Sequence, residues 1–130
     1  RDVAPSRGLG DVYKRQGEPL QKLYRTADAF VLPTREDCFG LVLLEAMCAS
    51  LPIISSKYAD GARDLVSDGE NGYIIDPEDV DGFAEAIQKA AAGDMASVMG
   101  KKSYEKAHEF SFEQVSKGCI AALSYVLSQK

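Results

Sequence analysis

The apolar positions of this chain follow two different spacings along its length. Short, mostly apolar runs occur at residues 29–33, 52–55 and 73–75, and proline or turn-forming residues bound them. Runs of this kind are typical of strands that are buried on both faces of a sheet. Apolar residues at helical spacing predict helices at residues 18–27, 41–49, 62–66, 80–92, 96–109 and from 112 onward.

This order of elements predicts an α/β fold. Helices that alternate with short buried strands indicate a parallel sheet covered on both sides, so we expect a doubly wound parallel sheet followed by a helical C-terminus. Three short strands are fewer than a complete doubly wound domain normally has, which predicts a partial lobe. The last helix is expected to be capped by Ser111 and to carry an apolar face, whose members are Val115, Cys119, Ala122 and Val126.

The N-terminal segment fits neither spacing. Residues 1–16 hold a proline and two glycines, and residues 11–16 resemble the translated end of a transposon used to prepare sequencing libraries. We therefore expect 1–16 to be a non-native or disordered tail and 17–130 to be the partial lobe. A flexible natural N-terminus is the alternative.

The composition narrows the choice of partners. Of the 130 residues, 45% are hydrophobic and 27% are charged, which suits a globular domain. The formal net charge of -5 argues against nucleic acid as the main partner, because phosphate backbones are bound by clustered basic surfaces. No apolar stretch is long enough to span a bilayer. The three cysteines, Cys38, Cys48 and Cys119, are scattered and match no zinc-binding spacing, so we expect no metal site. We expect their thiols to be reduced and buried, and the protein to be cytoplasmic.

The segment that joins the first two predicted strands carries the candidate chemistry. It runs from a strand through a polar loop into a helix that begins near Gly40. Backbone N–H groups in a first helical turn lack intrahelical partners, and the helix dipole adds partial positive charge there. Because parallel sheets bind ligands at the carboxyl ends of their strands, we expect the amides of residues 39–42 to form a diphosphate site.

Two carboxylates flank this helix start. Asp37 precedes it, and Glu45 follows Asp37 by eight residues. Carboxylates accept hydrogen bonds from paired hydroxyls, so these two can contact a sugar and a ribose. A carboxylate in an otherwise apolar helix is costly unless it is paired or faces a ligand, which favours a functional Glu45. A Glu45 side chain that simply points to solvent is the alternative.

The stretch from Ala27 to Met47 resembles the signature of family-4-type retaining glycosyltransferases with the GT-B fold. The resemblance rests on two carboxylates with seven residues between them, around Phe39-Gly40-Leu41, on the following Glu45-Ala46-Met47, and on the proline-led strand at 52–55. It extends through the turn at 68–73 to the helix start at 110–112, so it covers residues 17–130. It implies a Rossmann-like, N-terminally truncated C-terminal lobe, the lobe that binds the nucleotide-sugar donor.

The resemblance implies a role for each matching residue. Glu45 would hold the ribose hydroxyls, and Asp37 would take the catalytic position, where a carboxylate contacts hydroxyls of the donor sugar. The other donor-binding positions are Thr34, Phe39, Gly40 and Leu41. Two residues depart from the family pattern. Asp37 replaces a glutamate and so shortens the reach by ~1.5 Å, and Ser50 stands where the family usually has glycine.

The family transfers a sugar from a nucleotide-sugar, most often a UDP-sugar, to an acceptor with retention, and it needs no metal or other cofactor. The resemblance places the acceptor-binding N-terminal lobe, and the basic pair that clamps the diphosphate, outside this chain. We therefore expect the chain alone to be inactive. Relatives that act on lipids attach peripherally to membranes, and this sequence leaves such attachment open.

Two other functions compete with this one. A nucleotide-sugar epimerase of the same fold would need a second carboxylate and a histidine in the upstream half. A non-catalytic GT-B-like binding module would keep the fold without the chemistry, and the replacement of glutamate by Asp37 gives that alternative some weight.

Overall fold

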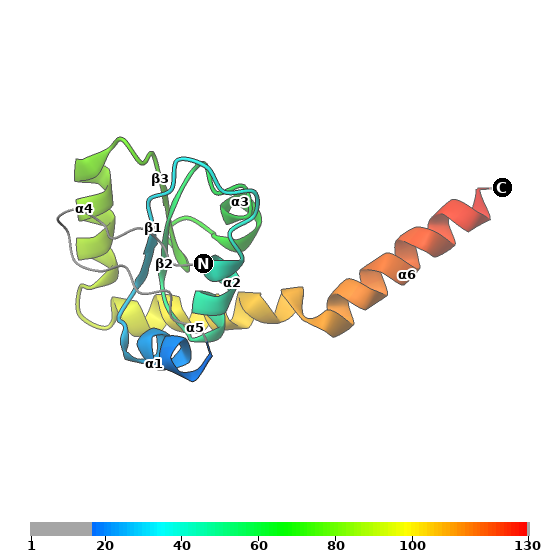
Figure 1. The fold of residues 1–130 in the computed structure, drawn as a ribbon, viewed down its shortest axis with the longest axis horizontal. Coiled ribbons are helices and arrows are strands. Elements are labelled where there is room, and N and C mark those ends of the chain that lie inside the picture. The colour runs from blue at the N-terminus through cyan, green and yellow to red at the C-terminus, as the bar shows by residue number, and fades with distance from the viewer. Residues whose placement is uncertain (1–16, 130) are drawn as a thin grey trace, which may run out of the picture.

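The computed structural model describes residues 17–129, which form three strands and seven helical segments (Figure 1). In chain order these are α1 (Glu18–Thr26), β1 (Phe30–Leu32), α2 (Leu41–Cys48), β2 (Ile53–Ser56), α3 (Ala62–Leu65), β3 (Gly72–Ile75), α4 (Val80–Ala90), α5 (Met95–Ala107), η1 (His108–Phe110) and α6 (Phe112–Ser128). Every predicted strand and helix is confirmed, with boundaries that differ by a few residues. The tail predicted at 1–16 lies outside the described residues.

The three strands form one parallel sheet in the order β1-β2-β3. Ile53 in the central strand pairs with Phe30 on one side and with Gly72 on the other. All four residues of β2 are buried, which explains why its sequence shows no alternation of apolar and polar positions. The predicted parallel α/β sheet is therefore confirmed.

Adjacent side chains of β2 enter two separate cores on opposite faces of the sheet. Ile53 packs with Leu43 of α2 and Leu65 of α3. Ile54 packs with Phe83 of α4 and Met99 of α5. Successive side chains of a strand point to opposite faces, so helices cover both sides of the sheet, as the doubly wound prediction requires.

Helix α5 crosses the edge of the sheet at which the strands begin. Its Ser103 hydroxyl donates a hydrogen bond of 3.2 Å to the carbonyl of Asn71, the residue before β3. A Cβ added at Gly100 would lie only 2.1 Å from the carbonyl oxygen of Ser50, which precedes β2. Because this helix occupies the amino edge, ligand binding is left to the carboxyl edge.

Helix α6 extends away from the sheet and its covering helices (Figure 1). Ser111 caps it as predicted, since its hydroxyl accepts a hydrogen bond of 3.4 Å from the Gln114 amide. No residue of α6 is buried against the described part of the chain, and Phe112 is 97% exposed. The predicted apolar face of α6 is therefore present, and no element within residues 17–129 packs against it. No helix in that range is long and apolar enough to cross a membrane.

The expectation of buried cysteines is wrong. Cys38, Cys48 and Cys119 are all exposed. Cys38 lies in the loop before α2, Cys48 is the last residue of α2, and Cys119 lies on the projecting α6. Their apolar neighbours in the sequence suggested burial, but the side chains fall on the faces of these elements that do not enter either core.

The end of α2 explains why glycine would suit position 50. The Ser50 amide donates to the Met47 carbonyl at 2.9 Å and the Leu51 amide to the Ala46 carbonyl at 3.2 Å, which together form a Schellman cap. Ser50 has a φ of 60°, a left-handed conformation that costs any residue with a Cβ. The tertiary fold thus imposes a strained backbone on this serine.

We predict that Ser50→Gly raises the free energy of unfolding by about 1 kcal/mol, because glycine adopts the left-handed conformation without that cost. Chemical denaturation of the chain measures the change. The matched control is Ser116→Gly at an exposed, interior position of α6, which should lower stability by up to about 1 kcal/mol. Equal destabilisation by both substitutions would contradict the left-handed geometry.

Candidate functional site

Two glycines shape the loop that leads from β1 into α2 at the carboxyl edge of the sheet. Gly40, the N-cap residue of α2, has φ 75° and ψ 57°, which is left-handed. Gly61 lies against the same loop, and a Cβ there would sit 2.0 Å from the carbonyl oxygen of Phe39. The absence of a side chain at both positions allows the tight turn that starts the helix. The predicted glycine-hinged helix start is therefore present.

The amides at this helix start are partly free. The N–H groups of Gly40, Leu41 and Val42 donate to no acceptor within residues 17–129. The Phe39 amide, in contrast, donates to Asp37 Oδ1 at 3.1 Å. The expectation of a free amide is thus wrong at Phe39, because the short aspartate side chain reaches the N–H two residues ahead. Three amides therefore lack an acceptor in the described chain; of these residues Leu41 is exposed, Val42 is half-buried and Gly40 is buried.

Asp37 is held firmly by the strand-like pairing of its backbone. Its amide donates to the Tyr58 carbonyl at 3.1 Å, and its carbonyl accepts from the Asp60 amide at 3.2 Å. The side chain is half-buried and lines a pocket of about 390 Å³ at the carboxyl edge, together with Lys57 and Arg63. With Oδ1 committed to the Phe39 amide, Oδ2 is the oxygen that accepts no hydrogen bond from the described residues.

Two cationic side chains of this pocket form ion pairs with carboxylates in the segment after β3. Lys57 pairs with Asp76, and Arg35 Nε lies 2.9 Å from Glu78 Oε1. The hydrogen bond to Asp76 raises the pKa of Lys57, and the same bond lowers the pKa of the Asp76 carboxyl. Nothing in the sequence indicates that the loops after β2 and β3 meet, so the pairing of Lys57 with Asp76 could not be predicted from it.

Thr34 has a local role in the structure. Its hydroxyl donates a hydrogen bond of 2.8 Å to the carbonyl of Glu36, which tightens the turn after β1. It lines neither the carboxyl-edge pocket nor the pocket that contains Glu45. The structure therefore supplies no direct support for Thr34 as a donor-binding residue.

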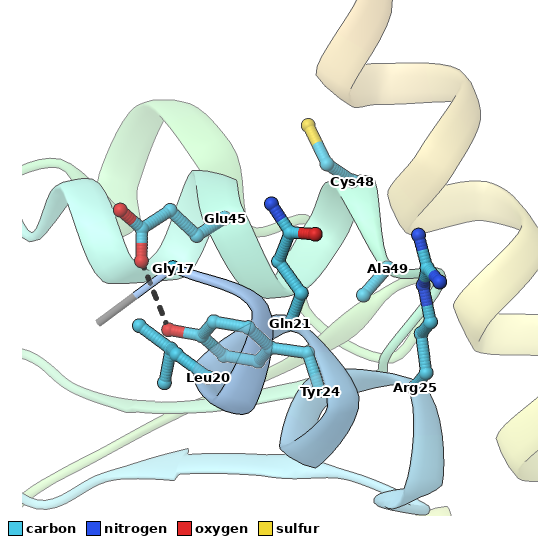
Figure 2. A pocket seen from close by; sticks show the side chains of 8 residues that line it. All are labelled: Gly17, Leu20, Gln21, Tyr24, Arg25, Glu45, Cys48 and Ala49. Atoms are coloured by element: carbon cyan, nitrogen blue, oxygen red, sulfur yellow. Dashed lines mark hydrogen bonds between the residues drawn. The ribbon is translucent and has the colours of Figure 1, made fainter. Parts of the chain in front are cut away.

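Glu45 lines a second pocket, which lies between α1 and α2 and has a volume of about 480 Å³ (Figure 2). Its lining residues are Gly17, Leu20, Gln21, Tyr24, Arg25, Glu45, Cys48 and Ala49. Although Glu45 is exposed, Oε2 of its carboxylate accepts a hydrogen bond of 3.0 Å from the Tyr24 hydroxyl. Glu45 thus faces a pocket with a specific partner rather than pointing freely into solvent.

Tyr24 is the residue of this pocket that sequence reasoning missed. The sequence marks it only as one member of the apolar face of α1. Burial first, and then the hydrogen bond with Glu45 and the charge of that carboxylate, raise the pKa of Tyr24 to about 12. Its ring packs against Phe30, with centroids 5.9 Å apart. The phenol therefore stays protonated and donates to Glu45 throughout the physiological pH range.

The two candidate carboxylates do not share a pocket. The pocket of Asp37 and the pocket of Glu45 have no lining residue in common. Leu41 and Glu45 are separated by about 6 Å along the axis of α2 at 1.5 Å per residue. A single ligand that contacts both carboxylates would have to reach from one pocket to the other.

With this geometry established, comparison with known proteins gives the family. The model of the family described as glycosyl transferases group 1 matches residues 11–107. The chain belongs to the glycosyl transferases group 1 family. The match begins inside the tail predicted at 1–16 and includes the whole helix start with Asp37 and Glu45.

Individual group 1 relatives agree with this result. The D-inositol 3-phosphate glycosyltransferase of Corynebacterium urealyticum is 28% identical over 120 residues, which cover 92% of this chain and 28% of that protein. Sucrose-phosphate synthase from Thermosynechococcus elongatus superposes with a TM-score of 0.71 at 28% identity, over 83% of this chain and 27% of that one.

A third comparison concerns the fold alone. The pneumococcal O-GlcNAc transferase GtfA, solved with UDP and GlcNAc, gives a TM-score of 0.68 at 23% identity, over 83% of this chain and 23% of that one. The predicted GT-B-type, Rossmann-like fold is confirmed by these neighbours. The chain spans about a quarter of the length of the proteins that it matches.

We predict that Asp37→Ala lowers the free energy of unfolding by about 1 kcal/mol, because it removes the acceptor of the Phe39 amide. Asp37→Asn retains a carbonyl oxygen at that position and should leave stability nearly unchanged. Chemical denaturation of both variants measures the difference. If the two substitutions were equally destabilising, the negative charge of Asp37, and not its hydrogen bond to Phe39, would hold the loop.

Proposed function

We propose that this lobe binds a nucleotide-sugar and that the whole protein transfers the sugar to an acceptor with retention of anomeric configuration. The observation that carries the proposal is the row of three free amides, at residues 40–42, between two pocket-lining carboxylates. An elongated ligand with hydroxyls at both ends and anionic phosphates in the middle matches this order. A nucleoside diphosphate sugar has that chemistry.

The two ends of the donor have different sites in this proposal. Glu45, in the pocket between α1 and α2, accepts hydrogen bonds from the ribose hydroxyls. Asp37, in the carboxyl-edge pocket, uses its free Oδ2 for hydroxyls of the transferred sugar. One oxygen of each carboxylate is already bonded to the protein, so neither side chain needs to find its orientation when the ligand arrives.

The amides between them serve the chemical step. As the bond from the sugar to the diphosphate breaks, negative charge accumulates on the leaving phosphate. Backbone N–H groups at the positive end of α2 stabilise that charge without moving, which is the most effective form of electrostatic catalysis. This role requires no metal or other cofactor. The acceptor and the remaining donor contacts come from parts of the protein that lie outside this lobe.

The identity of the nucleotide is proposed by analogy. The sequence resemblance implies a nucleotide-sugar donor, and the GtfA structure, which shares the fold, was solved with UDP and GlcNAc. A UDP-sugar is therefore the first donor to test, with a hexose as the transferred group. Because the chain spans about a quarter of its relatives, nucleotide binding is a more direct assay for it than turnover.

The experiment measures the affinity of the chain for UDP by isothermal titration calorimetry. We predict that Glu45→Gln weakens UDP binding about 10-fold or more, because hydrogen bonds to a charged acceptor contribute about 1.5–3 kcal/mol. The matched control is Glu113→Gln, the same change on the projecting α6, which should leave affinity unaltered. Unchanged UDP affinity in Glu45→Gln would remove the ribose role from this residue.

A further inference from the structure

We propose that Tyr24 is a positioning residue for donor recognition, which holds one oxygen of Glu45 so that the carboxylate presents its remaining lone pairs to a vicinal diol. The inference rests on the proposed function, because it deepens the role given there to Glu45. It assigns a task to α1, a helix none of whose residues is buried.

The contact between the two side chains is specific. The Tyr24 hydroxyl donates to Glu45 Oε2 at 3.0 Å across the pocket between α1 and α2 (Figure 2). Within residues 17–129, Glu45 Oε1 accepts no hydrogen bond. A carboxylate offers about four lone-pair sites, so the phenol occupies one and leaves three for two ligand hydroxyls. Tyrosine and diol can therefore bind Glu45 simultaneously.

Glu45 needs such a partner because it is exposed. A glutamate has three side-chain torsions, and fixing them on ligand binding costs conformational entropy. A side chain that is already held in the binding orientation avoids that cost, which is the usual gain from preorganisation. Within residues 17–129, the Glu45 side chain has one hydrogen bond, which it accepts from Tyr24, so this bond fixes its orientation.

Tyr24 is itself well anchored. Its ring packs against the Phe30 ring of β1 and adjoins the core formed by α2 and α3. Packing against the sheet therefore fixes the position of the Tyr24 hydroxyl. A pKa raised to about 12 keeps the phenol a donor at all pH values at which the nucleotide is stable.

The test compares ribonucleotides with their 2′,3′-dideoxy counterparts. The affinity of the 130-residue chain is measured for UDP, ADP and GDP and for the three dideoxy forms, with and without Tyr24→Phe. We expect the chain to bind its preferred ribonucleotide more tightly than the dideoxy form. Tyr24→Phe keeps the packing against Phe30 and should weaken ribonucleotide binding about 3- to 10-fold while leaving dideoxy binding unchanged.

Two further variants make the result specific. Tyr104→Phe, the same change on α5 next to His108, serves as the matched control and should alter neither affinity. Glu45→Asp leaves the tyrosine in place but withdraws the carboxylate by one C–C bond, so it should reduce the preference for the ribose form in the same way. Tyr24→Leu, which also removes the hydroxyl, carries the same expectation as Tyr24→Phe and decides the matter if Tyr24→Phe fails to fold.

The possible outcomes separate the inference from the function beneath it. Equal weakening of ribose and dideoxy forms by Tyr24→Phe, or an unaltered preference, overturns the positioning role while leaving Glu45 as the diol acceptor. A wild-type chain that does not distinguish the two forms overturns the diol role of Glu45 and the inference with it. Failure to bind any of the nucleotides also overturns both.

Discussion

The site depends on one constraint, the tight backbone turn that starts α2 at Gly40. This turn is left-handed at Gly40 and is pressed against Gly61 through the Phe39 carbonyl. As a result α2 begins directly at the carboxyl edge of the sheet with three unused amides. Helix α5 occupies the opposite edge, and the two cores fix α2 and α4 on the two faces. The packing of the whole lobe therefore positions one helix start at the carboxyl edge of the sheet.

The proposed roles of the two carboxylates follow from their positions relative to that helix start. Asp37 and Glu45 lie in separate pockets, with the first turn of α2 between them. Each has one oxygen tied to the protein, through the Phe39 amide and the Tyr24 hydroxyl respectively. In both cases the bond restrains an otherwise exposed or half-exposed side chain. The same design principle, a held carboxylate with a free oxygen, thus appears at each end of the proposed donor.

Much of this could be predicted from the sequence, because local rules agree with the fold. The strand runs, the caps at Asp79 and Ser111 and the glycine at the start of α2 follow from patterns within a few residues of each other. Contacts between distant segments could not be predicted in this way. The bond from Tyr24 to Glu45 joins residues 21 positions apart, and the pair of Lys57 with Asp76 joins residues 19 apart.

Two expectations are wrong for different physical reasons. The cysteines were placed inside because their neighbours are apolar, yet the side chains fall on outward faces. The Phe39 amide is not free, because the Asp37 side chain closes a turn by accepting a hydrogen bond from the N–H two residues ahead. The backbone strain at Ser50 could not be predicted either. The sequence shows only a serine where the family usually has glycine, and the left-handed backbone that favours glycine is visible only in the structure.

The most direct test of the central claim is a map of backbone amide shifts in the chain when UDP is added, by heteronuclear NMR. If the start of α2 receives the diphosphate, the largest shifts fall on the amides of Gly40, Leu41 and Val42, and those of α6 do not move. Saturable binding whose largest shifts lie elsewhere, with these three amides unperturbed, would contradict the account.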